Sequence, residues 1–282
     1  MKRTSEIRLI ALDVDGTLAA WGDEVTPRTR EALARIRKAG IQVTIATGRR
    51  YRTTQRVVDA LGIPVDTVCL GGALVKDAGG TTLHREHFDA ADFGSLQQVA
   101  RDHGQAVVCH RDSASQGGAD FRIDVDAEWN EPTVRYWQQN EAWGSRMTGF
   151  GLESCPDALV MGCFGLEPDL RAFQATVEAA HPQSFEPNLV PAPLLEGWYL
   201  ELTPRGVSKW TGLRTLAANS GVAPESICAV GDQVNDLPML RQAGMAVAME
   251  NAVDSVKAEA DWVTGRCDED GLVAVVDRIL GG

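Results

Sequence analysis

The stretch Asp13-Val14-Asp15-Gly16-Thr17-Leu18 directly follows the apolar run Ile7-Arg8-Leu9-Ile10-Ala11-Leu12. This run has the length and the branched side chains of a buried strand, so we expect both carboxylates where the strand ends and the backbone turns. Charged groups at the edge of a core are costly unless a cation or hydrogen bonds compensate them, which favours a divalent metal. Gly16 would allow a turn sharp enough for the following N–H groups to face one point.

The composition limits the class of protein. The 282 residues suffice for one large or two moderate domains with a sizeable core. With 44% hydrophobic and 23% charged residues, the chain is typical of a soluble globular protein. The formal net charge of -12 argues against nucleic-acid and anionic-membrane partners, which would be repelled. An anionic substrate would therefore need a metal and a few aimed cations to hold it locally.

Cysteine spacing and apolar runs indicate a cellular location. The six cysteines form no C-x-x-C pair and no cluster with zinc-site spacing, so we expect reduced core residues. That is usual in a cytoplasmic protein. Lys2, Arg3 and Arg8 precede an apolar stretch that Asp13 interrupts, and the stretch is too short for a signal peptide. No segment approaches the roughly 18 apolar residues of a membrane span.

The first part of the chain alternates strand and helix patterns. The predicted elements are a strand at 7–12, a helix at 26–39, a strand at 41–46, a helix at 51–61 and a strand at 65–70. This spacing predicts a parallel sheet with helices packed on its faces, and ligands of such folds collect at the carboxyl ends of strands. Both Asp13 and Thr47 lie at such ends.

The pattern becomes mixed after Gly72. The predicted elements are hairpin strands at 73–75 and 81–83, a helix at 91–103, a strand at 106–109, a loop at 111–120, a strand at 121–125, a helix at 132–143, a strand at 158–166, a helix at 168–180 and a strand at 198–202. We expect four prolines to break the chain before this last strand; they are Pro182, Pro187, Pro191 and Pro193. The mixed character predicts an α+β insert.

The last part of the chain again alternates strand and helix patterns. The predicted elements are a helix at 208–220, a strand at 227–230, a helix at 235–243, a strand at 245–249 and helices at 252–260 and 271–280. We therefore predict an α/β fold, a doubly wound, mainly parallel Rossmann-like sheet interrupted by an inserted α+β domain. The predicted bounds are 1–85 for the first half of the core, 86–199 for the insert and 200–282 for the second half.

Four motifs can meet at one edge of this sheet. They are Asp-Val-Asp-Gly-Thr from Asp13, Thr-Gly-Arg from Thr47, Gly-Val-Ser-Lys ending at Lys209, and Gly-Asp-x-x-Asn-Asp from Gly231. In this order, with a large insert before the lysine, they resemble the haloacid dehalogenase superfamily, and most closely its Cof-like branch of capped sugar-phosphate phosphatases. The resemblance extends to Glu250-Asn251-Ala252 and Asp270-Gly271, and it implies that the insert is a cap.

The resemblance also implies residue roles. Asp13 would be the nucleophile that forms an aspartyl phosphate, and Asp15 would protonate the leaving alkoxide and then deprotonate the attacking water. Mg²⁺ would be held directly by Asp13 and Asp232, beside the backbone carbonyl of Asp15, with Asp236 acting through water. The residues expected to bind or orient the substrate phosphate are Thr47, Gly48, Lys209 and Asn235. Arg49 is expected to form a structural pair.

Each motif has a structural alternative. Asp-x-Asp-Gly also occurs in calcium loops, and Glu24 falls where the last ligand of an EF-hand would be. However, Leu18 stands where that loop needs glycine, and a strand rather than a helix precedes the motif. Thr47 alone could cap a helix, and Lys209 alone could be an exposed helix residue. Their joint appearance at strand ends favours the catalytic interpretation.

Two other stretches have composition typical of sites. We interpret His84-Arg85-Glu86-His87 as a solvated edge. We interpret the aromatic helix face of the insert as packing onto its own sheet, with contact to the organic part of a substrate as the alternative; its members are Trp129, Tyr136, Trp137 and Trp143. Many relatives have Asn-Gly-Ala where this chain has Gly71-Gly72-Ala73, and a small residue where Trp210 stands. Both departures concern substrate choice rather than the nucleophile, acid or metal set.

The predicted function is a Mg²⁺-dependent phosphatase of small phosphorylated metabolites, with sugar phosphates as the expected substrates and the cap selecting the leaving group. A phosphomutase on the same scaffold, a regulatory phospho-receiver and a non-catalytic binding protein are the alternatives. Asp15 discriminates against the phospho-receiver, because a general acid two residues after the nucleophile serves hydrolysis and has no purpose in a slow switch. Neither the substrate nor the oligomeric state follows from the sequence.

Overall fold

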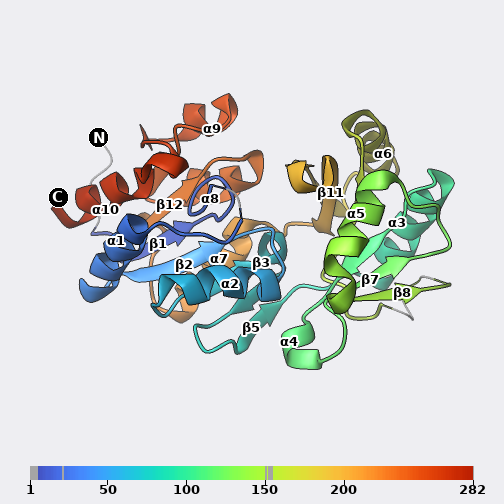
Figure 1. Ribbon diagram of the computed structural model, residues 1–282, viewed down its shortest axis with the longest axis horizontal. Coiled ribbons are helices and arrows are strands. Elements are labelled where there is room, and N and C mark those ends of the chain that lie inside the picture. Colours follow the sequence, from blue (N-terminus) through green and yellow to red (C-terminus); the bar gives the residue numbers. More distant parts are fainter. Residues whose placement is uncertain (1–5, 21, 150, 152–154, 282) are drawn as a thin grey trace. The chain divides into compact units, whose positions relative to one another are not determined.

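The computed structural model describes residues 6–20, 22–149, 151 and 155–281. Lys2 and Arg3, which entered the prediction about the N-terminus, lie outside these ranges. The chain divides into two compact units, a core unit of Met1–His84 with Ser208–Gly282 and an inserted unit of Arg85–Val207 (Figure 1). No helix in the described ranges is both long and apolar enough to cross a membrane.

The core unit is built around an eight-stranded sheet in the order β14-β13-β12-β1-β2-β3-β4-β5. In that order the strands are Trp262–Val263, Met245–Ala248, Ile227–Gly231, Leu9–Leu12, Gln42–Ala46, Asp66–Cys69, Leu74–Lys76 and Thr82–Arg85. The strands from β14 to β3 are parallel, and β4 pairs antiparallel with β3. The predicted doubly wound, mainly parallel α/β fold is confirmed.

Strand β1 explains why both faces of this sheet carry helices. Its four residues are fully buried, with Ile10 and Leu12 in one apolar cluster and Leu9 and Ala11 in the other. The helices on the first face are α1 (Pro27–Lys38), α2 (Tyr51–Leu61) and α10 (Gly271–Gly281). Those on the second are α7 (Lys209–Asn219), α8 (Leu237–Gln242) and α9 (Asp254–Glu259). Each buried leucine or isoleucine stabilises this arrangement by about 1.5–3 kcal/mol.

The inserted unit has its own six-stranded sheet, in the order β10-β11-β9-β6-β7-β8. In that order the strands are Phe185–Ala192, Gly197–Pro204, Val160–Gly165, Val108–His110, Phe121–Asp124 and Gly144–Met147. Only β7 and β8 pair in parallel among the described strands of this sheet. The helices are α3 (Ala90–Asp102), α4 (Ser113–Gln116), α5 (Glu131–Asn140) and α6 (Glu167–Ala180). Strands and helices together make this unit α+β.

The predicted chain break is wrong at two of the four prolines, whereas Pro182 and Pro193 lie outside the strands. Pro187 and Pro191 both lie inside β10, where they pair in register with Leu202 and Trp198 of β11. Strand β10 is at the edge of its sheet, and an edge position tolerates a residue that has no N–H to donate inward. Strands β8 and β14 and the short helix α4 were also absent from the prediction.

The insert extends further along the chain than residue 199. Strand β11 pairs with β10 on one side and with β9 on the other, so it belongs wholly to the sheet of the inserted unit. The core unit resumes only at Ser208, one residue before α7 begins. The lysine motif therefore follows directly on the end of the inserted unit.

Most of the aromatic face of the insert packs within its own unit. Tyr136 stacks on Phe164 of β9 with ring centroids 4.3 Å apart. Trp137 lies 5.7 Å from Trp129, and the guanidinium of Arg146 covers its ring at 4.7 Å. These contacts support the packing interpretation for this face.

Candidate active site

Three neighbouring strands bring distant motifs together at one edge of the core sheet. Strand β1 lies between β12 and β2, so the residues that follow these strands are neighbours. The N–H of Asp13 donates to the carbonyl of Val230 (3.1 Å), and the N–H of Thr47 donates to that of Val68 (2.8 Å). Parallel strands end at the same edge, and this register places Asp13, Thr47 and Asp232 there.

Helix α7 supplies a buried lysine to this edge. The hydroxyl of Ser208 accepts from the N–H of Thr211 and caps the helix. Lys209, the first helical residue, is 1% exposed, and its Nζ donates to Oδ1 of Asp13 and to Oδ1 of Asp236, each at 2.7 Å. The alternative of an exposed helix lysine is therefore wrong.

Gly72 fixes where α7 begins. Its φ is +117°, and a Cβ at this position would lie 2.0 Å from the carbonyl oxygen of Ser208. Gly71, next to it, has a φ of +63°, in the left-handed region that glycine and asparagine adopt most readily. Glycine at position 71 therefore suits the backbone conformation.

Gly16 has a comparable role at the first motif. Its φ is +84°, and a Cβ there would lie 2.3 Å from Oδ2 of Asp232. The carbonyl of Gly16 accepts from Nδ2 of Asn251 (2.7 Å), which anchors the turn. Only glycine lets the turn after Asp15 approach Asp232 so closely.

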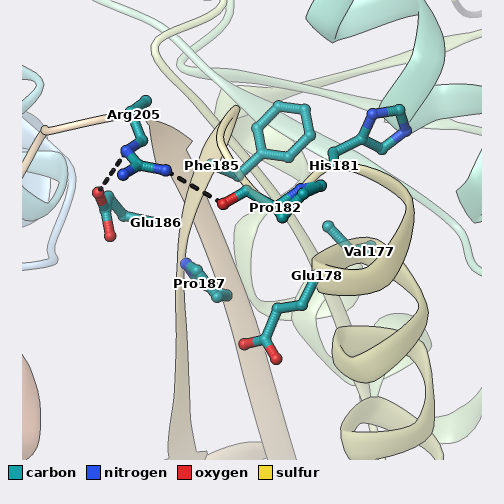
Figure 2. Close-up of a pocket in the computed structure, with 8 residues that line it drawn as sticks. All are labelled: Val177, Glu178, His181, Pro182, Phe185, Glu186, Pro187 and Arg205. Carbon is teal, nitrogen blue, oxygen red and sulfur yellow. Dashed lines mark hydrogen bonds and ion pairs between the residues drawn. The ribbon is translucent and has the colours of Figure 1, made fainter.

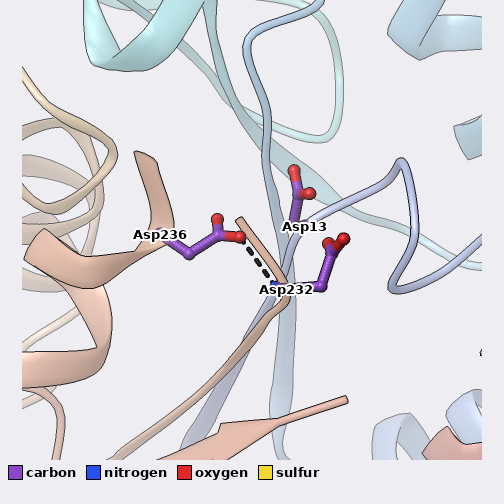
Figure 3. A group of neighbouring side chains, drawn as sticks. All are labelled: Asp13, Asp232 and Asp236. Carbon is purple, nitrogen blue, oxygen red and sulfur yellow. Dashed lines mark hydrogen bonds between the residues drawn. The ribbon is translucent and has the colours of Figure 1, made fainter. Parts of the chain in front are cut away.

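Three buried carboxylates form the centre of the site. One carboxylate oxygen of each of Asp13, Asp232 and Asp236 lies within 4.8 Å of the others. In Figure 3 the carboxylates of Asp13 and Asp232 point to the same side, while Asp236 reaches the backbone of Asp232. Oδ2 of Asp236 accepts from the N–H groups of Asp232 (2.9 Å) and Gln233 (3.0 Å), and its Oδ1 accepts from Lys209. Three of the roughly four acceptor positions of Asp236 are thus occupied.

Burial and like charge shift the pKa values of this cluster. Burial raises the pKa of Asp13 well above its usual range; Lys209 opposes this rise, and Asp236 and Asp232 add to it. Burial and the charge of Asp236 raise the pKa of Asp232 to about 7, although Thr17 donates a hydrogen bond to its Oδ1 (3.1 Å). Burial alone would lower the pKa of Lys209, but Asp13 and Asp236 outweigh it and raise the pKa. The protein alone does not compensate these carboxylates fully.

The donor set of the cluster fits a divalent cation. Three carboxylates against the single ammonium of Lys209 leave a formal charge of -2. The oxygen atoms of Asp13 and Asp232 are the hard ligands that Mg²⁺ prefers, and the raised pKa values show that a cation would be stabilising here. The calcium-loop alternative is wrong, because strand β1 precedes Asp13 and the neighbouring carboxylates come from the end of β12.

Arg49 binds Asp15 through both carboxylate oxygens. Its Nε donates to Oδ2 (2.8 Å) and its Nη2 to Oδ1 (2.6 Å), which makes a bidentate fork. Burial of Arg49 opposes its charge, but the hydrogen bonds and charge of Asp15 and Asp23 raise its pKa. Asp15 is a partner of the structural pair that the sequence predicts for Arg49 without identifying its other member. The position of Arg49 shortly after β2, which lies next to β1, is the sequence feature that could have identified Asp15 as its partner.

Thr47, Gly48 and Asn235 lie in the turns at this edge. The hydroxyl of Thr47 accepts from the N–H of Arg49 (3.1 Å), and the residue before α2 is Arg50, so Thr47 is not the cap of that helix. Gly48 is half-buried between Thr47 and Arg49. Oδ1 of Asn235 is buried and has no hydrogen-bond partner among the residues that the structure describes. The structure thus brings every predicted site residue to the same edge of the core unit.

The comparisons with known proteins identify the family. A family model described as haloacid dehalogenase-like hydrolase matches residues 10–276. The chain belongs to this family. The hydrolase is 29% identical to the 5-amino-6-(5-phospho-D-ribitylamino)uracil phosphatase YwtE of Bacillus subtilis, over 98% of this chain and 99% of that protein. It is 28% identical to the pyridoxal phosphate phosphatase YbhA of Escherichia coli, over 95% and 97% of the two chains.

Comparison with a solved structure places the fold in the same family. A haloacid dehalogenase-like hydrolase from Bacteroides thetaiotaomicron is 26% identical and superposes with a TM-score of 0.77, covering 97% of this chain and 99% of that one. The predicted membership of the haloacid dehalogenase superfamily, in its Cof-like branch, is confirmed, and so is the prediction that the chain is an enzyme of the hydrolase class.

Two of the remaining predicted features of the hydrolase have structural explanations. Trp210 packs against the apolar cluster beneath α7. In the stretch His84-Arg85-Glu86-His87, Arg85 binds the buried carboxylate of Asp112 through Nη2 (2.7 Å). Neither residue contacts the carboxylate cluster through an interaction that the structure records.

The inserted unit of the hydrolase contains a hollow of about 360 Å³ between α6 and the start of β10 (Figure 2). Its one guanidinium, that of Arg205, donates to the carbonyl of Pro182 (3.1 Å) and lies 3.7 Å from Glu186. The eight lining residues include none of the predicted site residues; they are Val177, Glu178, His181, Pro182, Phe185, Glu186, Pro187 and Arg205.

Proposed function

We propose that this hydrolase is a divalent-metal-dependent phosphatase that releases phosphate from small phosphorylated metabolites through an aspartyl phosphate on Asp13. The observation that carries the proposal is the buried contact of Lys209 with Asp13 beside Asp232. Asp13 can act as a nucleophile, and the ammonium of Lys209 can bind phosphoryl oxygens. Beside them, the carboxylates of Asp13 and Asp232 lack enough positive charge from the protein to be neutralised. The two phosphatases named above support the same reaction.

Asp13 and Asp232, with the backbone carbonyl of Asp15, would hold Mg²⁺. When bound, Mg²⁺ would neutralise charge on the phosphoryl group and keep the carboxylate of Asp13 ionised despite its raised pKa. The hydrogen bonds already made by Asp236 suit it to orienting Lys209 and bracing the backbone of Asp232, with one acceptor position left for a water. Its expected contact with the metal would therefore be indirect.

In the first displacement, a carboxylate oxygen of Asp13 attacks phosphorus and the bond from phosphorus to the ester oxygen breaks. Asp15 gives its proton to that oxygen, so an alcohol leaves rather than an alkoxide. Lys209 and the hydroxyl of Thr47 hold the phosphoryl oxygens, with the N–H of Gly48 and the amide of Asn235 beside them. The buried Oδ1 of Asn235 lacks a partner in the described part of the chain and can only accept a hydrogen bond, which suits it to orienting the ammonium of Lys209 rather than to binding a phosphoryl oxygen.

In the second displacement, Asp15 is ionised and takes a proton from a water molecule. The water oxygen attacks phosphorus, and the bond from phosphorus to Asp13 breaks. Inorganic phosphate leaves, Asp13 is again a carboxylate and Asp15 is again protonated. The two steps together consume one water molecule per ester.

The proposal also concerns which phosphate esters the hydrolase accepts. We infer that the inserted unit, Arg85–Val207, serves as the cap that selects the leaving group, as the family resemblance implies. Sugar phosphates remain the expected class, and the substrates named for the two relatives widen it to phosphate esters of small metabolites that carry a heterocycle. The predicted cytoplasmic location suits such substrates.

The test is release of inorganic phosphate from a panel of sugar phosphates, pyridoxal phosphate and p-nitrophenyl phosphate, with Mg²⁺ and with a chelator. We expect turnover of at least one ester with Mg²⁺, none with the chelator, and none for Asp13→Asn. Asp59→Asn is the matched control, because the exposed carboxylate of Asp59 contacts Gln55 and lies outside the site.

Other outcomes identify the alternatives. Interconversion of phosphate isomers without free phosphate would favour a phosphomutase, and an aspartyl phosphate that accumulates without turnover would favour a phospho-receiver. Turnover that persists in Asp13→Asn or in chelator contradicts the proposal.

A further inference from the structure

The donors of Arg49 are divided between two carboxylates. Nε and Nη2 bind the two oxygens of Asp15, whereas Nη1 binds Oδ1 of Asp23 at 2.6 Å. Nη2 also donates to the carbonyl of Gly22 (2.7 Å). One side of the Arg49 guanidinium thus binds Asp15. The other side binds Gly22 and Asp23, in the loop that follows the first motif.

The carboxylate of Asp15 depends on this arrangement for its orientation. Its side chain is 40% exposed, and in the part of the chain that the structure describes its hydrogen bonds come from Arg49 alone. A carboxylate has about four acceptor positions, so a fork that uses two of them leaves the others free to exchange a proton. Arg49 can therefore fix Asp15 without preventing it from acting.

Arg49 in turn needs a second anchor. An arginine side chain has several rotatable bonds, and freezing them costs about 2 kcal/mol of conformational free energy. Asp23 and the Gly22 carbonyl provide the anchor, since they occupy the donors that face away from Asp15. The side chain of Arg49 is only 16% exposed, which strengthens both charged contacts.

A second contact of Asp23 is much weaker. Nη1 of Arg56 lies 3.7 Å from Oδ2 of Asp23, and the side chain of Arg56 is 60% exposed. An exposed pair at this distance is screened by water and contributes little. The short contact with Arg49 is therefore the one that can transmit a change at Asp23 to the site.

We propose that Asp23 is a positioning residue for the general acid: it fixes Arg49, and Arg49 fixes the carboxylate of Asp15 for proton transfer to the leaving oxygen. The inference rests on the proposed phosphatase function, because it concerns the step in which the ester bond breaks. It adds to the reaction a residue outside the four motifs, which touches neither substrate nor metal.

The test compares two esters that differ in their need for an acid. An alkyl phosphate releases a strongly basic alkoxide and requires the proton from Asp15, whereas p-nitrophenyl phosphate releases a weakly basic phenolate and requires it little. We expect Asp23→Ala to lower kcat/KM for the alkyl ester by about tenfold, a part of the 10²–10⁴-fold that general acids supply. For the aryl ester we expect a change of less than about twofold.

Two variants sharpen the comparison. Asp23→Asn keeps an oxygen that can accept from Nη1 of Arg49, so it should restore part of the alkyl-ester activity that Asp23→Ala loses. Asp59→Asn removes the same charge from the same unit without touching Arg49, and both esters should react as with the wild type. The aryl-ester activity of each variant also reports that the site is folded.

The outcomes separate the two proposals. A wild-type protein that hydrolyses no ester of the full panel of sugar phosphates, pyridoxal phosphate and p-nitrophenyl phosphate overturns the phosphatase function itself. A wild type that hydrolyses both the alkyl and the aryl ester, together with an Asp23→Ala variant in which the two esters lose equally or lose nothing, overturns the positioning role and leaves the phosphatase function standing. Faster alkyl-ester turnover in Asp23→Ala overturns it as well, since Arg49 would then restrain Asp15 rather than position it.

Discussion

The ammonium of Lys209 lies 2.7 Å from Oδ1 of Asp13, although 196 positions separate the two residues in sequence. Both side chains are almost completely buried, and the same ammonium binds Asp236 at 2.7 Å. A buried charge that loses its partners is strongly destabilising, so the ammonium of Lys209, which binds both carboxylates, supports the fold as well as the site.

Lys209→Met should therefore destabilise the protein. The substitution leaves Asp13 and Asp236 buried without their cation, and we expect the free energy of unfolding to fall by about 3–5 kcal/mol. Urea denaturation in the presence of chelator measures the change. Lys38→Met removes the same charge at an exposed position of α1 and should change stability by less than about 0.5 kcal/mol. An equal effect of both variants contradicts the prediction.

Asp13→Asn should separate activity from stability. We expect activity to fall by at least about 10³-fold, because an amide cannot serve as the nucleophile. Stability in chelator near neutral pH should not fall, because burial raises the pKa of Asp13 and a neutral side chain avoids the cost of its charge. The unfolding midpoint of the variant checks this. A large loss of stability would mean that the charge of Asp13 supports the fold.

The raised pKa of Asp232 predicts a pH-dependent effect of Mg²⁺. Between its ordinary value of 3.8 and about 7, the folded metal-free protein keeps a proton that the unfolded chain has released. The unfolded state then binds fewer protons, so this group makes stability fall as pH rises through that window. Mg²⁺ competes with the proton for the carboxylate and should bind better at the upper end.

Thermal unfolding with chelator and with Mg²⁺ measures this effect. The increase in unfolding midpoint caused by Mg²⁺ should be larger at about pH 8 than at about pH 5. At a concentration of about 100 times Kd the stabilisation should approach 2.7 kcal/mol. Asp232→Asn should lose the increment at both pH values. Equal increments at both pH values in the wild type would contradict the raised pKa of Asp232, and an undiminished increment in Asp232→Asn would show that Asp232 is not a ligand.

Gly72→Ala should disrupt both stability and activity. Its Cβ would lie 2.0 Å from the carbonyl oxygen of Ser208, which is backbone and cannot swing away, so α7 and Lys209 must move. We expect a loss of more than about 4 kcal/mol. The control is Gly40→Ala, at a φ of +83° with nothing within 4 Å of its Cβ, where only the backbone conformation costs about 1–2 kcal/mol. Similar unfolding midpoints for the two variants would refute the steric explanation.

Much of the core unit could be predicted because its elements follow local rules. Helix α2 spans Tyr51–Leu61 as predicted, and α1 begins after Thr26, whose hydroxyl accepts from the N–H of Thr29. The strands of the inserted unit follow these local rules less closely. Pro187 and Pro191 looked like breaks, and only the edge position of β10 makes them compatible with a strand.

The sequence by itself determined the parallel sheet, the motifs at its strand ends and the family, because hydrophobic periodicity and motif order are written along the chain. Only the tertiary structure decided which charges compensate which. It paired Lys209 with Asp13 and Asp236, left the three-carboxylate cluster short of positive charge, and joined Asp15 through Arg49 to Asp23. Charge compensation depends on distance and burial, and residues far apart in sequence acquire both only when the strands pair.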